Sequence, residues 1–422
     1  MPDSTRSRNP VLRFLRKLGP GLITGAADDD PSGVATYSIA GAQFGTTFLW
    51  TALLTLPLMA FVQMMCARVG MVTGRGLASA LGRKFPRWLI LIVAFALFVA
   101  NSINVGADLA GMGDAAKMLC GLDSRWFVLL FGAGIAWATI GWNYARIANV
   151  LKWLSLALGA YIITGFIVHP NWGEVARAAF LPSLPHGHEA WGVLVAILGT
   201  SISPYLFFWQ TSQEVEEEKC RGQGAPAMRK GASEAELGDR KLDVATGAFA
   251  SNSVMFFIIL TTAMTLHAHG ITHIETSKDA AAALGPLAGK FAETLFAIGL
   301  IGVGLLAIPT LTGSSAYALA EAMRWRQGLN REFHSARAFY TVIIASTIVG
   351  IGINFAGMSP VRALYWSAVI NGLLAPFLLL GVVLLASDSK LMQGQPSSRW
   401  SIVMVSITTL LMFGAGVGMF VF

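Results

Sequence analysis

Residues 19–45 read GPGLITGAADDDPSGVATYSIAGAQFG, an apolar stretch interrupted near its middle by three aspartates and a proline. The stretch exceeds the roughly 20 helical residues that cross a bilayer core. Proline lacks an amide hydrogen and disfavours helical geometry in the residue before it, so we expect the helix to break at Asp30-Pro31-Ser32-Gly33. Unwound main chain inside a membrane is tolerated only where it is buried in protein or lines a cavity.

Apolar stretches of similar length recur along the whole chain of 422 residues, of which 55% are hydrophobic and 13% charged. This composition leaves too little polar surface for water-soluble domains of that size and indicates an all-α polytopic membrane protein. We predict eleven transmembrane helices, at 18–44, 46–71, 88–116, 126–145, 148–168, 190–213, 243–267, 291–322, 338–355, 361–385 and 400–422. The basic start of the chain lacks a small-residue cleavage site, and we predict no signal peptide.

The chain has a net charge of +7, and its basic residues are distributed according to the predicted topology. With the N-terminus in the cytoplasm, 24 of the 30 Lys and Arg residues lie on the cytoplasmic side. The positive-inside rule therefore predicts a cytoplasmic N-terminus and an external C-terminus in the plasma membrane. Basic residues scattered over six loops do not form one nucleic-acid-binding face, so we expect no nucleic-acid partner.

A second interruption follows five spans after the first, in ILGTSISPYLFFWQTS at 197–212. Since five is odd, a repeat of spans 1–5 in spans 6–10 has the opposite orientation, which brings both breaks to one midplane site. We predict a cytoplasmic tail at 1–17, repeat 1 at 18–168, repeat 2 at 190–385 with a cytoplasmic loop at 214–241, and an additional span at 400–422. The alternative is that Pro31 and Pro204 only kink two packed helices.

The acids Asp28, Asp29 and Asp30 lie near the middle of span 1, where a carboxylate costs about 2.5–3.5 kcal/mol on insertion scales. No Lys or Arg lies in the central part of any predicted span. A transported cation is then the expected counter-charge, with Asp30 as its main ligand and Asp28 and Asp29 as accessory candidates. The other candidate ligands are oxygen atoms near the two breaks, which suit hard cations: carbonyls near Ala27 and Thr200, and hydroxyls of Ser32, Ser203 and Tyr205.

Other polar groups have two interpretations each. Asp108 in span 3 is either an accessory group near the pathway or a partner for Asn101 and Asn104. Asp243 at the start of span 7 either forms a gate contact or, as we favour, is solvated or interacts with the dipole at the N-terminus of that span. The acids that begin at Glu214 either gather cations or form a solvated helix end, which we favour. The histidines His267, His269 and His273 are expected to be solvated rather than metal ligands.

These residues resemble the NRAMP family of divalent metal transporters over most of the chain. Asp30-Pro31-Ser32-Gly33 lies at the position of the family's Asp-Pro-Gly-Asn motif, and Ser203-Pro204-Tyr205 lies at the position of Met-Pro-His. The resemblance implies the LeuT-type 5+5 inverted repeat with discontinuous helices 1 and 6, and it implies metal contact at the motif position Gly33.

The departures from the family pattern concern selectivity and proton coupling. Ser203 replaces a methionine whose sulfur favours soft ions. Gly111 stands in place of a glutamate, Tyr205 and Gln210 in place of two histidines, and Ala368 in place of a glutamine. This pattern is similar to the NRAMP-related magnesium transporters, which implies transport of Mg²⁺ or Mn²⁺ without proton coupling.

We therefore expect a transporter that is not an enzyme, with a divalent cation as substrate and no cofactor. Two alternatives remain: a proton-coupled Mn²⁺ or Fe²⁺ importer, and a LeuT-type carrier of an organic solute. An intramembrane hydrolase is disfavoured, because paired catalytic acids would need a partner on a second helix, whereas the three consecutive acids lie together on one. The sequence does not determine the oligomeric state.

Overall fold

The computed structural model describes residues 19–141, 156–185, 187–224, 228–229, 231–357 and 359–421, and these contain helices and connecting loops but no strand. The α-helices are α2 (Pro20–Asp28), α3 (Pro31–Phe44), α4 (Leu49–Thr73), α5 (Leu77–Leu81), α6 (Arg87–Cys120), α7 (Ser124–Gly141), α9 (Gly159–Ile167), α10 (Trp172–Phe180), α11 (His188–Ser201), α12 (Pro204–Cys220), α13 (Glu234–Thr265), α14 (Ser277–Ala281), α15 (Gly285–Ala288), α16 (Ala292–Met323), α17 (Arg337–Ile353), α18 (Pro360–Ala386) and α19 (Arg399–Val421). Short 3₁₀ turns are η1 (Gly45–Phe48), η2 (Leu156–Leu158), η3 (His267–His269), η4 (Ala282–Leu284), η5 (Gly289–Phe291), η6 (Phe333–Ser335) and η7 (Asn354–Ala356).

The predicted spans correspond to these helices. Eight helical stretches in the described residues are long and apolar enough to cross a membrane, and α17 is a shorter apolar helix. The fifth predicted span, 148–168, lies partly outside the described residues, which resume at 156 and include α9. The predicted tail at 1–17 also lies outside them. The loop predicted at 214–241 is shorter than expected, because α12 continues to Cys220 and a capping box at Ser233 starts α13.

Both predicted breaks are present, and each is followed by a helix that begins with proline. The α2 helix ends at Asp28 and α3 begins at Pro31, with the Asp30 side chain as its N-cap. In the second break, α11 ends at Ser201 and α12 begins at Pro204. Proline is favoured at the first position of a helix because its missing amide hydrogen is not needed there.

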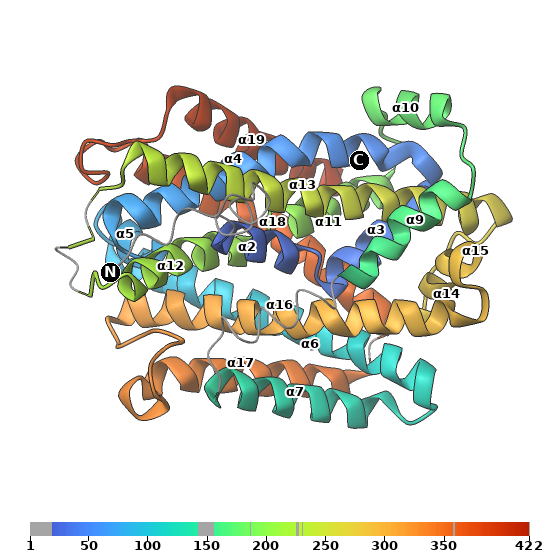
Figure 1. Ribbon diagram of the computed structural model, residues 1–422, viewed down its shortest axis with the longest axis horizontal. Coiled ribbons are helices and arrows are strands. Elements are labelled where there is room, and N and C mark those ends of the chain that lie inside the picture. The colour runs from blue at the N-terminus through green and yellow to red at the C-terminus, as the bar shows by residue number, and fades with distance from the viewer. Residues whose placement is uncertain are drawn as a thin grey trace, which may run out of the picture.

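The packing of the helices follows the inverted repeat. The first broken helix, α2 and α3, packs on α13, which is span 7. In the second broken helix, α12 packs on α4, which is span 2, while α11 packs mainly on α18. The contacts of span 1 with span 7 and of span 6 with span 2 are the pair that an inverted repeat relates to each other. Figure 1 shows the short α2 in the middle of the molecule, between α13 and α16, while α7 and α17 run side by side along one edge. The fold class predicted from the sequence is confirmed.

The loops rich in Lys and Arg meet at one end of the bundle, which we call the basic end. It comprises the connecting segments at 74–86, which include α5, and at 221–224, 228–229, 231–233, 324–336 and 387–398. Arg229 donates to the Gly74 carbonyl, Lys84 pairs with Asp388 at 3.0 Å, and Gln395 bonds Ala232. The amino end of α2 points to this same end, where it meets Asp243 of α13.

Glycine contacts bring α2 unusually close to α13. A Cβ atom added at Gly25 would lie 2.6 Å from the Gly247 main chain, and one added at Gly247 would lie 2.5 Å from the Gly21 carbonyl oxygen. Small residues at membrane helix interfaces permit this approach of two backbones. The position of α2, and with it the position of the break, depends on these glycines.

Replacement of Gly25 by valine is expected to destabilise the protein. Overpacking of a closely packed interface costs about 1–3 kcal/mol, and main chain cannot move aside as a flexible side chain can. The measurement is the thermal unfolding midpoint in detergent, which should fall by several degrees in Gly25→Val. Gly134→Val on α7 is the control, because a Cβ there meets nothing within 4 Å. Equal midpoints in the two variants would contradict this account of the interface.

Candidate functional site

Asp30 lies at the first break and is held by three hydrogen-bond donors. Its Oδ1 accepts from the Ser32 hydroxyl at 2.6 Å and from the Gly33 amide at 2.8 Å. Its Oδ2 accepts from the Asn104 amide of α6 at 3.1 Å. A carboxylate at a helix N-terminus is also stabilised by the helix dipole. These three hydrogen bonds and the helix dipole offset part of the cost of burying the Asp30 carboxylate. A cation is therefore not the only group that compensates for its charge.

The two breaks contact each other directly through Tyr205. The Tyr205 hydroxyl donates to the Ala27 carbonyl at 2.9 Å, so a carbonyl freed near the first break obtains its partner from the second. The Tyr205 carbonyl in turn accepts from Ser314 of α16 at 2.9 Å. The Ala27 carbonyl and the Tyr205 hydroxyl, which were both predicted at the site, are therefore adjacent, and each is the hydrogen-bond partner of the other.

Ser203 and Thr200 are buried beside the second break. The Ser203 hydroxyl donates back to the carbonyls of Gly199 and Thr200, at 2.8 and 2.7 Å, which leaves its lone pairs for another group. The Thr200 hydroxyl is 1% exposed and has no hydrogen-bond partner. A Cβ atom added at Gly33 would lie 3.0 Å from this hydroxyl oxygen. Gly33 and Thr200 thus bring the two breaks together at a second point.

Asp28 and Asp29 face a different helix from Asp30. Ser251 of α13 contacts both carboxylates, with its hydroxyl 2.9 Å from Asp28 Oδ2 and 3.0 Å from Asp29 Oδ1. A hydroxyl has one hydrogen to donate, so it cannot satisfy both acids fully. The structure places these two predicted accessory residues together and apart from the Asn104 side of Asp30. Ser251 carried no signal in the sequence, because its partners are more than 200 positions away.

Asp108 is completely buried on α6, one turn beyond Asn104. Neither of its carboxylate oxygens has a hydrogen-bond partner. The interpretation that Asp108 is a partner for Asn101 and Asn104 is wrong. Asn101 donates to the Leu311 carbonyl and to Ser315, and Asn104 donates to Asp30. Asn104, which the sequence suggested only as a partner of Asp108, is therefore a further candidate site residue.

The four membrane acids have no basic neighbour in the described segments. Asp28, Asp29, Asp30 and Asp108 are between 0% and 6% exposed, and none forms an ion pair with any described residue. Four carboxyl groups in an apolar interior require protons or cations to balance their charge. The site can therefore hold a positive ion, and its donor atoms are oxygens.

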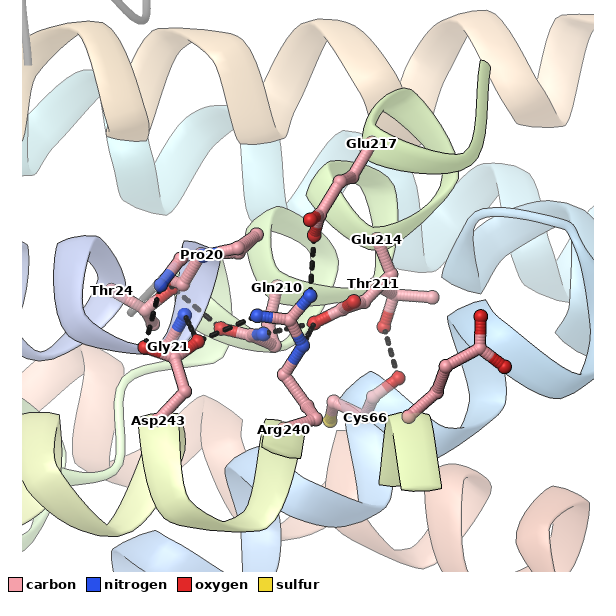
Figure 2. A network of polar contacts seen from close by, with 12 residues as sticks. Pro20, Gly21, Thr24, Cys66, Gln210, Thr211, Glu214, Glu217, Arg240 and Asp243 are labelled. Atoms are coloured by element: carbon pink, nitrogen blue, oxygen red, sulfur yellow. Dashed lines mark hydrogen bonds and ion pairs between the residues drawn. The ribbon is translucent and has the colours of Figure 1, made fainter. Parts of the chain in front are cut away.

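A network of ion pairs connects three helices at the basic end (Figure 2). Arg240 of α13 pairs with Asp243 at 2.6 Å and with Glu214 of α12 at 2.8 Å, and it also bonds Glu217. Asp243 accepts from the amides of Gly19, Gly21 and Leu22 at 2.8–3.0 Å. The favoured interpretation of Asp243, a solvated or dipole role at the start of its own span, is wrong, because Asp243 is 1% exposed, lies inside α13 and accepts from the start of α2.

The same network extends toward the break through two further side chains. Gln210 donates to Glu214 at 2.7 Å and accepts from Thr24 of α2 at 2.6 Å. The favoured interpretation of Glu214 as part of a solvated helix end is wrong, since Glu214 is 2% exposed and ion-paired. The charge on Arg240 is what allows this acid to be buried.

A cavity of about 560 Å³ opens at the other end of the bundle. Its lining includes Ile39 and Gln43 of α3, Glu189, His273, Glu275 and Arg362. His267 and His269 each bond a main-chain carbonyl, and no group of three or more metal-ligating side chains was found in the described part of the chain.

The paired breaks, the repeat-related packing and the buried acids define a membrane transporter of the LeuT-type fold. The family model described as natural resistance-associated macrophage protein-like matches residues 21–422. The chain belongs to this Nramp family.

Named proteins and solved structures are similar to this chain over most of its length. A divalent metal cation transporter from Caldanaerobacter subterraneus is 26% identical over 407 residues, which cover 92% of this chain and 90% of that protein. Among solved structures, a manganese transporter from Eremococcus coleocola has a TM-score of 0.72 with 18% identity, covering 97% of this chain and 87% of that one. Mhp1, a nucleobase-cation-symport-1 family transporter, has a TM-score of 0.55 with 16% identity and covers 95% and 90%. These structures share the fold.

Loss of the Asp243 carboxylate should release the amino end of α2. Hydrogen bonds to charged groups are worth about 1.5–3 kcal/mol, so Asp243→Asn should raise the exposure of α2 about tenfold or more. The measurement is maleimide labelling of Thr24→Cys in a background with Cys66→Ala, Cys120→Ser and Cys220→Ser. Glu234→Gln, an exposed change at the start of the same helix, is the control. An unchanged labelling rate in Asp243→Asn would show that this carboxylate does not hold α2.

Proposed function

We propose that this protein transports divalent metal cations across the plasma membrane by alternating access around Asp30. The supporting observation is a buried carboxylate at a helix break, beside a second break, with no ion pair to any described basic residue. A divalent cation balances such a charge, and the family's named relative is a divalent metal cation transporter. The candidate ligands are Asp30, the Ala27 carbonyl, Gly33, Thr200, Ser203 and Tyr205.

The proposed substrates are Mg²⁺ and Mn²⁺. The side chains at the two breaks offer carboxylate and hydroxyl oxygens, and Ser203 supplies oxygen where the family motif has sulfur. Hard cations favour oxygen ligands, whereas thioether sulfur favours softer ions such as Cd²⁺. The absence of sulfur from this motif position supports weak discrimination between Mg²⁺ and Mn²⁺, with no preference for Cd²⁺.

We further propose that transport is not coupled to protons. Gly111 stands where the family pattern has a glutamate, and Pro31 and Leu364 pack closely against it. At the histidine positions, Tyr205 bonds Ala27, and Gln210 links α2 to the ion pairs of the basic end. A proton-coupled Mn²⁺ or Fe²⁺ importer is the alternative that the retained Asp108 favours.

The proposed topology has repeat 1 at 18–168, repeat 2 at 190–385 and an additional span at 400–422. The basic end would face the cytoplasm under the positive-inside rule. The N-terminus is then cytoplasmic, the C-terminus is external, and the cavity beside Gln43 and Arg362 opens to the outside.

Binding isotherms of the purified protein test the role of Asp30. We expect Mg²⁺ and Mn²⁺ to bind with affinities within about tenfold of one another, and Asp30→Ala to lose both, because the charge that attracts the ion is gone. Asp388→Ala is the control, because this half-buried acid at the basic end pairs with Lys84, away from both breaks. Saturable binding of an organic solute with no response to metal would instead favour a LeuT-type organic carrier.

Transport into vesicles tests the absence of proton coupling. Purified protein in liposomes should take up Mn²⁺ or Mg²⁺ down its gradient without acidification of the lumen, read by an entrapped pH dye. Uptake should also proceed when an ionophore removes the proton gradient. A strict requirement for that gradient, together with Cd²⁺ uptake comparable to Mn²⁺ uptake, would support the proton-coupled alternative.

A further inference from the structure

The strongest unexplained feature of the molecule is a group of oxygen atoms on α6 without partners. Both carboxylate oxygens of Asp108 and the amide oxygen of Asn104 are buried without a hydrogen bond. Both side chains are 0% exposed. Buried polar atoms are almost always paired, so three orphan acceptors on adjacent turns require an explanation.

These orphan oxygens lie on the Asp30 side of the break. Residues four apart on a helix share one face, with Cβ atoms about 6 Å apart, so Asn104 and Asp108 point the same way. Asn104 is bonded to Asp30 Oδ2, which fixes that direction. Asp108 lies near Asp30 and near the Ser32 amide at the start of α3, which approaches its carboxylate without reaching full hydrogen-bond geometry. The α6 face is thus adjacent to the proposed metal ligand.

The Asn104 side-chain nitrogen donates to Asp30, and the unsatisfied atoms left on Asn104 and Asp108 are acceptors. A cation satisfies acceptors and also offsets the charge of the Asp108 carboxylate, which pairs with no described basic residue. Carboxylate and amide oxygens are ligands that Mg²⁺ and Mn²⁺ prefer. Farther along α6, a Cβ atom added at Gly111 would lie 3.0 Å from Leu364 and 3.7 Å from Pro31, so the helix that follows the break packs against α6.

We infer that Asp108 and Asn104 are ligands of the transported divalent cation, which binds between α6 and the break at Asp30. This inference rests on the proposed function and adds a second carboxylate to its ligand set. On binding, the Asn104 side chain turns over, so that its oxygen replaces its nitrogen toward the ion. Two carboxylates balance one divalent charge, so the loaded site is electrically neutral without a bound proton.

The exchange of a ligand type provides the sharpest test. Asp108→Cys, in the background with Cys66→Ala, Cys120→Ser and Cys220→Ser, replaces a hard ligand by a thiolate, which favours Cd²⁺. The ratio of Cd²⁺ to Mg²⁺ affinity should rise at least tenfold. Ala110→Cys, a buried position on another face of α6, is the matched control. A structural role for Asp108 would leave this ratio unchanged, which would overturn the inference.

The loss of charge provides a second test. Asp108→Asn should weaken Mn²⁺ binding at least tenfold, while Asp114→Asn on the same helix, which caps the Ser277 amide, should not. Unaltered Mn²⁺ binding in Asp108→Asn together with loss of binding in Asp30→Ala would overturn the inference and leave the proposed function in place. Binding that survives in both variants would contradict both.

Discussion

The structure depends on the burial of carboxylates at a helix break. Three consecutive acids lie where α2 ends and α3 begins, and a fourth lies on α6, all within an apolar bundle. Each charge is costly in this environment unless hydrogen bonds or an ion compensate for it. Asp30 receives three donors and a helix N-terminus, Asp28 and Asp29 share one hydroxyl, and Asp108 receives no hydrogen bond. The four acids therefore differ in how far hydrogen bonds compensate for their burial, from Asp30 with the most donors to Asp108 with the fewest.

The sequence was sufficient to predict the fold and the two helix breaks beside which the candidate site lies. Pro31 and Pro204 mark both breaks because proline affects its own residue and the one before it, which are local effects. The distribution of Lys and Arg predicted one basic end, and contacts such as Lys84 with Asp388 connect the loops there. The spacing of five spans between the breaks predicted their pairing, and Tyr205 and Ala27 make that contact.

The partners of the acids could not be predicted, because they depend on how helices rotate about their axes. Asn104 was expected to pair with Asp108 one turn away, but the rotation of α6 directs its amide to Asp30. Glu214 looked like one of several acids at a solvated helix end. Its burial depends on Arg240, which the chain places 26 residues later at the start of another apolar stretch. Distances in sequence carry no information on such contacts.

The unequal surroundings of the two ends of α2 determine how this helix can move. At its amino end, α2 is held by the buried Asp243 carboxylate, which pairs with Arg240. At its carboxyl end, Asp28 and Asp29 share a single hydroxyl. Buried ion pairs are screened little by salt. The amino end of this nine-residue helix should therefore stay fixed when the ionic strength of the solution changes, and the less firmly held end is the one that carries the acids.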